Sequence, residues 1–250
     1  GPMLAREDPE AARLARLALE RDGVVFRTDA AIEKIEGKGE KLQAVLSGPS
    51  GKEAIEATHI LVAAGRRPVT GGLGLEKGGI AFTPNGITVD GCMKTSNRKV
   101  YAIGDVVGPP QFTHRSNYQA GLVIRNGLFR LPVRATDALL PRVTFTDPEI
   151  AAIGLSETEA FALGRGVRML RWPFAENDRA QAERRTEGFI KVMVDRKGRI
   201  LGVTIVGHNA GELLTPWTLA MANRLKIGAL MGITFPLSLI HISEPTRPRL

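Results

Sequence analysis

Apolar residues recur at helical spacing near the start of the chain. Between Glu10 and Arg21 they recur every three to four residues, which is typical of an amphipathic helix; they are Ala11, Leu14, Ala15, Leu17, Ala18 and Leu19. The preceding Asp8-Pro9 suits an N-cap residue followed by proline at the first helical position. Gly23 ends the pattern. The sequence therefore predicts a helix over Glu10–Arg21 that is terminated by Gly23.

Short apolar runs with turn residues between them predict strands in the next part of the chain. These runs are Val24–Phe26, Ala31–Ile35, Leu42–Leu46 and Ile60–Ala64. A hairpin turn is predicted around Gly37-Lys38-Gly39. The last run is apolar throughout and is followed by Gly65, so we expect a fully apolar strand there.

The second half of the chain has an α+β pattern. Ser156 and Glu159 have the S-x-x-E spacing of a capping box, which predicts a helix start. Two strands, Gly188–Val194 and Ile200–Val206, are joined by turn residues and read as a hairpin. The pattern then predicts a helix over Gly211–Leu225.

The segment Thr95–Asp105 carries the strongest candidate for chemistry. Val100–Ile103 is a short apolar run that predicts a buried strand, and Gly104-Asp105 follows at its carboxyl end. Ligands of open α/β sheets bind at that end of the strands. A carboxylate there accepts hydrogen bonds from a sugar hydroxyl. Asn117–Phe129 then predicts a helix whose N-terminus favours negative charge.

Composition narrows the class of protein. The chain has 250 residues, 43% hydrophobic and 24% charged, which fits one large or two ordinary globular domains. Its net charge is +8, but the basic residues are scattered and Arg184-Arg185 is flanked by Glu183 and Glu187, so nucleic-acid binding is disfavoured. No apolar run is long enough for a membrane helix, and no signal-peptide core is present, so we expect a soluble cytoplasmic protein.

Cysteine and histidine usage argues against a metal site. The single cysteine, Cys92, excludes an intrachain disulfide, and we interpret it as an apolar filler rather than as a redox thiol. The four histidines lack metal-ligand spacing. We also expect Trp172 and Trp217 to lie in the core or an interface rather than to stack on a cofactor.

The motif Thr95–Asp105 resembles the second FAD-binding motif of the pyridine nucleotide-disulfide oxidoreductases. Gly65-Arg66-Arg67-Pro68 matches the GRxP exit turn of their NAD(P)H-binding domain, and Gly86–Asp90 matches the short strand before the flavin motif. Pro141–Leu155 resembles the opening of their dimerisation domain. Within it, Phe145–Ala151 is similar to the dihydrolipoamide dehydrogenase and mercuric reductase branch.

This resemblance implies a fold class and an organisation. We expect Rossmann-like α/β nucleotide-binding fragments followed by an α+β dimerisation domain. The implied segments are the closing half of an NAD(P)H domain, a returning segment of an FAD domain, and a dimerisation domain, over residues 1–70, 71–138 and 139–236. Residues 237–250 depart from the family pattern and look like translated adapter or vector DNA, so His241 and Glu244 are not assigned a catalytic role.

The resemblance also implies cofactors, partners and a site. FAD and NAD(P)H are the expected cofactors, a homodimer forms through residues 139–236, and the acceptor is a small-molecule disulfide, a metal ion or a quinone. Such an enzyme serves redox homeostasis. No residue of this chain is assigned to catalysis or to a metal. The implied cofactor-binding residues are Asp105, Gly104, Gln111, Phe112, Thr113, His114, Gly65 and Ile32.

Several of these residues also have simpler interpretations. Asp105 fits a turn after a strand, Thr113 a helix cap, and Gly65 the glycine that follows a strand. The chain contains neither a GxGxxG motif nor a pair of cysteines separated by four residues, both of which the family uses. Two alternatives therefore stay open: a catalytically inactive dimerising remnant, and a parent protein that reduces quinones without a cysteine pair. We expect the 250 residues alone to bind no flavin.

Overall fold

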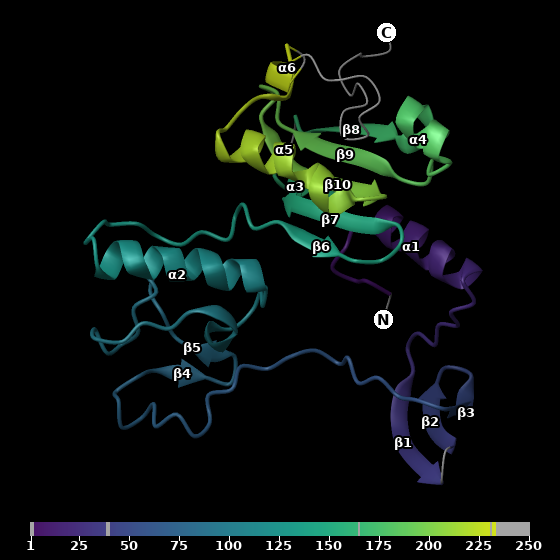
Figure 1. Cartoon of the computed structure of the whole chain (residues 1–250), viewed down its shortest axis with the longest axis horizontal. Coiled ribbons are helices and arrows are strands. Elements are labelled where there is room, and N and C mark those ends of the chain that lie inside the picture. Colours follow the sequence, from purple (N-terminus) through teal and green to yellow (C-terminus); the bar gives the residue numbers. More distant parts are fainter. Residues whose placement is uncertain (1–2, 39–40, 165, 231, 234–250) are drawn as a thin grey trace. The chain divides into compact units, whose positions relative to one another are not determined.

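The computed structural model describes residues 3–38, 41–164, 166–230 and 232–233. The chain divides into two compact units (Figure 1). The first combines Gly1–Ile60 with Pro141–Leu250, and the second is Leu61–Leu140. Gly39 of the predicted hairpin turn and the predicted tail 237–250 lie outside the described residues.

The predicted first helix is confirmed as α1 (Pro9–Arg21). Asp8 is its N-cap, and the Asp8 side chain accepts hydrogen bonds from the backbone N–H groups of Glu10 and Ala11. The buried face of α1 is small: Ala11 and Ala15 are fully buried and pack with the apolar residues Ile150, Phe189 and Val206. Alanine at these positions lets the helix backbone lie close to the sheet beneath it.

A small antiparallel sheet follows α1 in the sequence. Its strands pair in the order β1-β2-β3, so consecutive strands are neighbours. The predictions for the first two strands are confirmed, and the third strand was not predicted. The bounds are β1 (Ala31–Lys38), β2 (Lys41–Gly48) and β3 (Gly51–Ala57).

Two predicted strands, Val24–Phe26 and Ile60–Ala64, are wrong: neither run forms a strand. Their side chains face solvent, with Val25 71%, Leu61 90% and Val62 80% exposed. A strand buried on both faces needs neighbouring strands and covering helices. Within the described residues these two runs have no strand to pair with, so apolar composition alone does not make them strands.

The core of the first unit is a five-stranded antiparallel sheet in the order β6-β7-β10-β9-β8. Every residue of β9 is buried, as are all residues of β10 except Leu201, and α5 packs on β7 and β10. The predicted hairpin β9-β10 and the capping box of Ser156 and Glu159 are confirmed. The strands are β6 (Arg142–Thr144), β7 (Glu149–Gly154), β8 (Arg168–Pro173), β9 (Phe189–Val194) and β10 (Ile200–Gly207). The helices are α3 (Glu157–Ala162), α4 (Asp178–Glu183), α5 (Ala210–Ala222) and α6 (Ile227–Leu230), with a 3₁₀ turn η2 (Phe174–Glu176).

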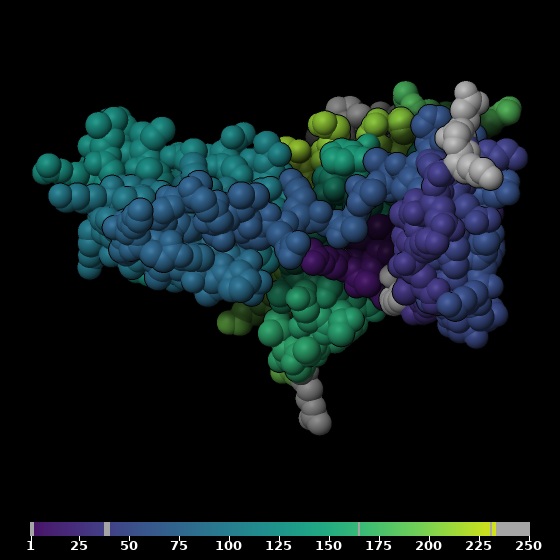
Figure 2. All heavy atoms as spheres, turned by 90° about the horizontal axis from the view of Figure 1, so that it is seen from below, coloured from purple at the N-terminus to yellow at the C-terminus, as the bar shows by residue number. Residues whose placement is uncertain are grey.

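The second unit contains little regular structure besides one helix. It forms a continuous blue-to-teal body in the space-filling view (Figure 2). Leu75, Ile87 and Ala102 form its small apolar core. Its elements are β4 (Phe82–Thr83), β5 (Gly86–Ile87), the 3₁₀ turn η1 (Gly104–Val107) and α2 (Thr113–Gly127).

Three predictions for this unit need correction. The run Val100–Ile103 forms only an isolated bridge, between Tyr101 and Lys94. The strand predicted at Gly86–Asp90 pairs only over its first two residues. The helix predicted from Asn117 begins four residues earlier, at Thr113. In each case the structure of a short segment depends on the residues that it contacts elsewhere in the chain, and the local pattern of apolar residues contains no information about those contacts.

Candidate functional site

Asp105 lies in a tight turn at the start of η1. Gly104 has φ +74°, and a Cβ atom there would lie 2.9 Å from the Ser116 hydroxyl oxygen, so only glycine fits without strain. The Asp105 carbonyl accepts hydrogen bonds from the N–H of Gly108 at 3.1 Å and from the Gln111 side chain at 3.4 Å. The carboxylate is 42% exposed, so a ligand can reach it.

Arg66 contacts the predicted ligand residue directly. Its guanidinium lies 3.1 Å from the Asp105 carboxylate, and it donates a second hydrogen bond to the Gln111 carbonyl at 2.8 Å. Arg66 belongs to the GRxP turn, but it was not among the residues predicted for the site. The GRxP motif was the signal that could have identified Arg66, because no other role was assigned to the arginine of that motif.

The loop between η1 and α2 is held by Arg115. This residue is only 8% exposed and forms a two-pronged ion pair with Asp137, at 2.9 and 3.0 Å. It also donates hydrogen bonds to the carbonyl oxygens of Gly108 and Pro110. Such a charge-assisted network fixes the loop against the helix. Sequence reasoning missed Arg115 because its partners lie in irregular segments.

Four of the predicted residues meet at the start of α2. Gln111 and Phe112 precede the helix, and Thr113 and His114 form its first turn. The rings of Phe112 and His114 stack with centroids 5.1 Å apart. No side chain hydrogen bond caps this end within the described residues, so its N–H groups and the helix dipole favour an electron-rich ligand atom. Thr113 does not serve as the cap.

The predicted nicotinamide-side residues are placed differently. Gly65 has φ +102° and directly precedes Arg66, and a Cβ atom there would meet nothing within 4 Å. Ile32 lies on β1 in the other unit and is 63% exposed. Within the second unit the structure therefore brings Gly104, Asp105 and the start of α2 together and joins Gly65 to them through Arg66, whereas Ile32 belongs to the first unit.

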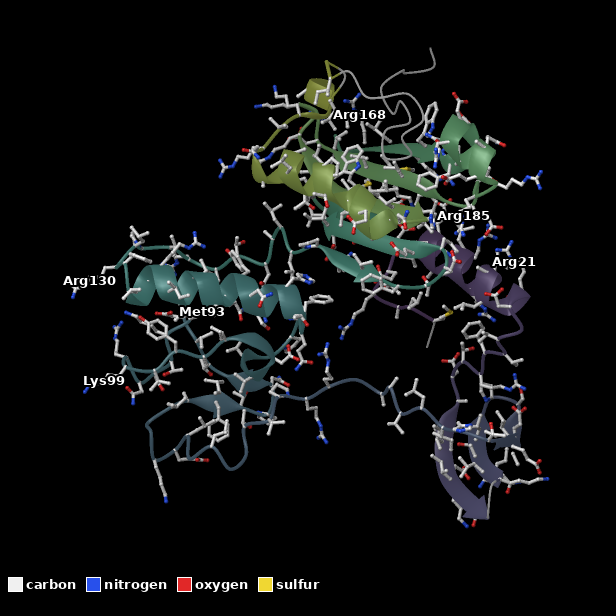
Figure 3. The ribbon with its side chains drawn as sticks, in the orientation of Figure 1. Arg21, Met93, Lys99, Arg130, Arg168 and Arg185 are labelled. Atoms are coloured by element: carbon white, nitrogen blue, oxygen red, sulfur yellow. The ribbon has the colours of Figure 1, made fainter. Side chains whose placement is uncertain are left out.

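Cys92 lies in the turn that Asp90 organises. The Asp90 carboxylate accepts hydrogen bonds from the N–H groups of Lys94 and Cys92, and these bonds hold its pKa below the ordinary value. Met93 in the same turn has φ +65° and is 4% exposed, and Figure 3 labels it beneath α2. Cys92 itself is partly buried. In the first unit, the prediction that Trp217 is a core residue is confirmed, since it is 3% exposed.

A hollow lies in the first unit, where Figure 3 labels Arg21 and Arg185. It encloses about 320 Å³. Arg21 pairs with Glu187, and Arg185 lies 3.1 Å from His208 and 3.8 Å from Asp147. The lining charges are balanced, so the hollow does not select for one sign of ligand.

Two kinds of feature are absent from the described residues: a cluster of metal ligands and a helix able to span a membrane. No group of three or more potential metal ligands occurs among them. None of their helices combines the length and the apolar character needed to cross a bilayer.

Comparison with known proteins gives matches along nearly the whole chain. Residues 2–120 match the family model "Pyridine nucleotide-disulphide oxidoreductase", and residues 140–237 match its dimerisation domain. A dihydrolipoyl dehydrogenase of Thermus scotoductus is 41% identical over 88% of this chain and 48% of its own length. A mercuric reductase of Bacillus cereus is 34% identical over 94% of this chain and 37% of its own length.

Solved structures agree with these matches. LpdA from Mycobacterium tuberculosis superposes with a TM-score of 0.87 at 26% identity, over 94% of this chain and 51% of that chain. The HOCl-induced flavoprotein disulfide reductase RclA from Escherichia coli gives 0.83 at 28% identity, over 93% and 53%. The chain thus spans about half the length of the relatives it matches. The expected fold class, nucleotide-binding α/β fragments followed by an α+β dimerisation domain, is confirmed, and the chain belongs to the pyridine nucleotide-disulfide oxidoreductase family.

Proposed function

We propose that this chain is part of an FAD-dependent NAD(P)H oxidoreductase. The observation that carries the proposal is the Asp105 turn beside the uncapped start of α2. Bound FAD would supply the redox chemistry, by accepting hydride from the nicotinamide and passing electrons to the acceptor. The residues of this chain hold and orient the cofactors, and none of them carries the thiol chemistry.

The geometry of the turn fits the ribityl and pyrophosphate part of FAD. The Asp105 carboxylate is exposed enough to accept hydrogen bonds from ribityl hydroxyls, and Gly104 has no side chain to obstruct them. Arg66 pairs with that carboxylate and adds a positive charge beside it. We propose that the start of α2, with Gln111, Phe112, Thr113 and His114, faces the flavin edge.

On the nicotinamide side, we propose Gly65 and Ile32 as NAD(P)H contacts. The residues that distinguish NADH from NADPH belong to a part of the family fold for which this chain shows no motif. The domain bounds 1–70, 71–138 and 139–236 are likewise proposals.

The acceptor is proposed only by class. The relatives named dihydrolipoyl dehydrogenase and mercuric reductase favour a small-molecule disulfide or a metal ion. A quinone is the alternative for a parent protein without a cysteine pair. We propose a cytoplasmic enzyme that acts in redox homeostasis.

A homodimer through residues 139–236 is part of the proposal. The match to the dimerisation domain supports it. Phe145 is 83% exposed and Leu219 64% exposed, and burying such side chains in an interface is favourable. The competing proposal is a dimerising remnant without activity, which fits the 250 residues considered alone.

The test combines the coding DNA with a flavin titration. Reading the DNA on both sides of this segment should show two GxGxxG motifs and a CxxxxC pair upstream. In the full-length protein, Asp105→Ala should weaken FAD binding about tenfold or more, because a charged hydrogen-bond acceptor is lost. Glu76→Gln, which neutralises an exposed carboxylate of the same unit, is the control and should leave FAD binding unchanged. Equal FAD binding by all three proteins would refute the assignment of Asp105.

A further inference from the structure

The Gly104 N–H has an unusual partner. This N–H group is buried, and it donates a 2.7 Å hydrogen bond to the side-chain oxygen of Gln119, fifteen residues away on α2. Gly104 itself is held at φ +74°. A buried N–H without a partner is destabilising, so the conformation of this turn depends on the Gln119 oxygen.

The contact with Gly104 satisfies the oxygen of the Gln119 carboxamide but not its nitrogen. Its side chain is 1% exposed, and its Nε2 has no hydrogen-bond partner among the described residues. Burying a carboxamide with an unsatisfied donor is unfavourable. An apolar side chain would avoid that penalty, so packing alone does not account for a glutamine here.

The same face of α2 holds both ends of the turn. Gln119 binds the N–H of Gly104 at the start of η1, and Arg115, one helical turn earlier, binds the carbonyl of Gly108 after its end. Ser116 lies between them, with its hydroxyl at the position that a Cβ atom of residue 104 would approach. Asp105 is therefore carried on a segment that α2 fixes at two points.

We propose that Gln119 is a positioning residue that fixes the Gly104–Asp105 turn through its side-chain oxygen and so sets the affinity for FAD. The contribution to FAD binding rests on the proposed function, whereas the effect on the turn does not. Gln119 does not touch the reacting atoms. It acts through the Gly104 backbone, which orients the Asp105 carboxylate.

Three variants separate this role from packing. Gln119→Met keeps the length and removes the oxygen. Gln119→Glu keeps an oxygen acceptor at the same length, and because burial disfavours its charged form, both readouts are taken at mildly acidic pH, where its carboxyl is neutral. Asn117→Met is the matched control, because it replaces an exposed carboxamide on the same helix. The first readout is hydrogen exchange of the Gly104 N–H in the full 250-residue chain.

We expect Gln119→Met to speed exchange at Gly104 about tenfold, the effect of losing one hydrogen bond, and the other two variants to stay near wild type. Ala102, whose N–H bonds the Met93 carbonyl, reports whether the unit is still folded. If Gln119→Met unfolds the unit, Gln119→Glu decides: a folded Glu variant that loses protection at Gly104 overturns the proposal. Equal protection in all variants also overturns it.

The second readout is FAD affinity of the full-length protein, from quenching of flavin fluorescence. Gln119→Met should raise the dissociation constant about tenfold, and Gln119→Glu should restore it. An unchanged constant in Gln119→Met overturns the role in cofactor binding. If the wild type binds no FAD, the proposed function fails, while the exchange result at Gly104 still decides whether Gln119 holds the turn.

Discussion

Replacing Lys191 by methionine should strongly destabilise the first unit. Lys191 lies on β9 with its side chain 5% exposed. Its ammonium group donates to the carboxylates of Asp8 at 2.8 Å and Glu157 at 2.7 Å, and Glu10 lies 3.3 Å away. One cation thus joins the starts of α1 and α3 to the sheet.

The magnitude follows from what the substitution leaves behind. The Asp8 side chain is 2% exposed, whereas those of Glu157 and Glu10 are 33% and 35% exposed. Breaking a buried ion pair by removing one partner costs about 3–5 kcal/mol, because the remaining charge is buried without compensation. Two of the three carboxylates can regain water, so we expect the lower end, about 3 kcal/mol.

Urea unfolding followed by tryptophan fluorescence measures this loss. Both tryptophans, Trp172 and Trp217, lie in the first unit, so the signal reports on it selectively. Lys197→Met is the matched control, since Lys197 is exposed in the β9-β10 turn and should leave the midpoint unchanged. A loss below about 1 kcal/mol for Lys191→Met, the size typical of an exposed pair, would refute the reasoning.

A second substitution tests the cause. Asp8→Asn in the Lys191→Met background removes the stranded charge and keeps a good N-cap residue. The double variant should therefore be more stable than Lys191→Met alone. If it were less stable, the loss would come from packing of the lysine chain rather than from the uncompensated carboxylate.

The pH dependence has a defined sign. Burial acts to lower the pKa of Lys191, but the hydrogen bonds to Asp8 and Glu157 outweigh it and raise the pKa above 10.5. Its contribution is thus present below pH 10.5 and is lost as pH rises through the raised value. Burial raises the pKa of Glu10, but Arg171 and Lys191 lower it below 4.5, so its contribution is lost as pH falls through that lowered value. The free energy of unfolding of the wild type should therefore exceed that of Lys191→Met by the largest margin between the lowered pKa of Glu10 and the raised pKa of Lys191.

Three further predictions concern backbone fit, capping and cofactor retention. Gly207→Ala should lower stability by about 2 kcal/mol or more in urea unfolding, because its Cβ atom would lie 2.1 Å from the Phe174 ring, whereas Gly228→Ala, in open space, should be neutral. Ser156→Ala should cost about 1 kcal/mol by the same assay, since it removes the hydroxyl that accepts from the Glu159 N–H. The purified 250-residue chain should show no flavin absorbance, and a yellow preparation would contradict this.

Local rules were enough to predict several elements from the sequence. The Asp8-Pro9 start of α1 and the capping box of Ser156 and Glu159 depend on residues within one helical turn, so the sequence contains all of the needed information. The β9-β10 hairpin is equally local, since its strands are joined by a short turn.

Strands that depend on distant partners were not predictable in this way. Ile60–Ala64 has the composition of a central strand, yet it lies in solvent, because a strand exists only where another strand pairs with it. The strands β3 and β8 show the opposite case. Neither was predicted, because its own apolar pattern is weak, yet each forms because a neighbouring strand pairs with it.

The residues of the candidate site also divide into those that a local motif identifies and those that depend on distant contacts. Asp105 and the start of α2 were found because they belong to one contiguous motif, whereas Arg66 and Gln119 reach the motif from 39 and 15 residues away. Nothing in the residue pattern separates Gln119 from the other polar residues of α2, since a buried polar position can be recognised only once its hydrogen-bond partner, here the donor N–H of Gly104, is known. A motif therefore identifies what touches a ligand, and the contacts behind it identify what holds that residue in place. Substitutions at the supporting positions are consequently the sharper test of whether this half of the fold is built for a cofactor.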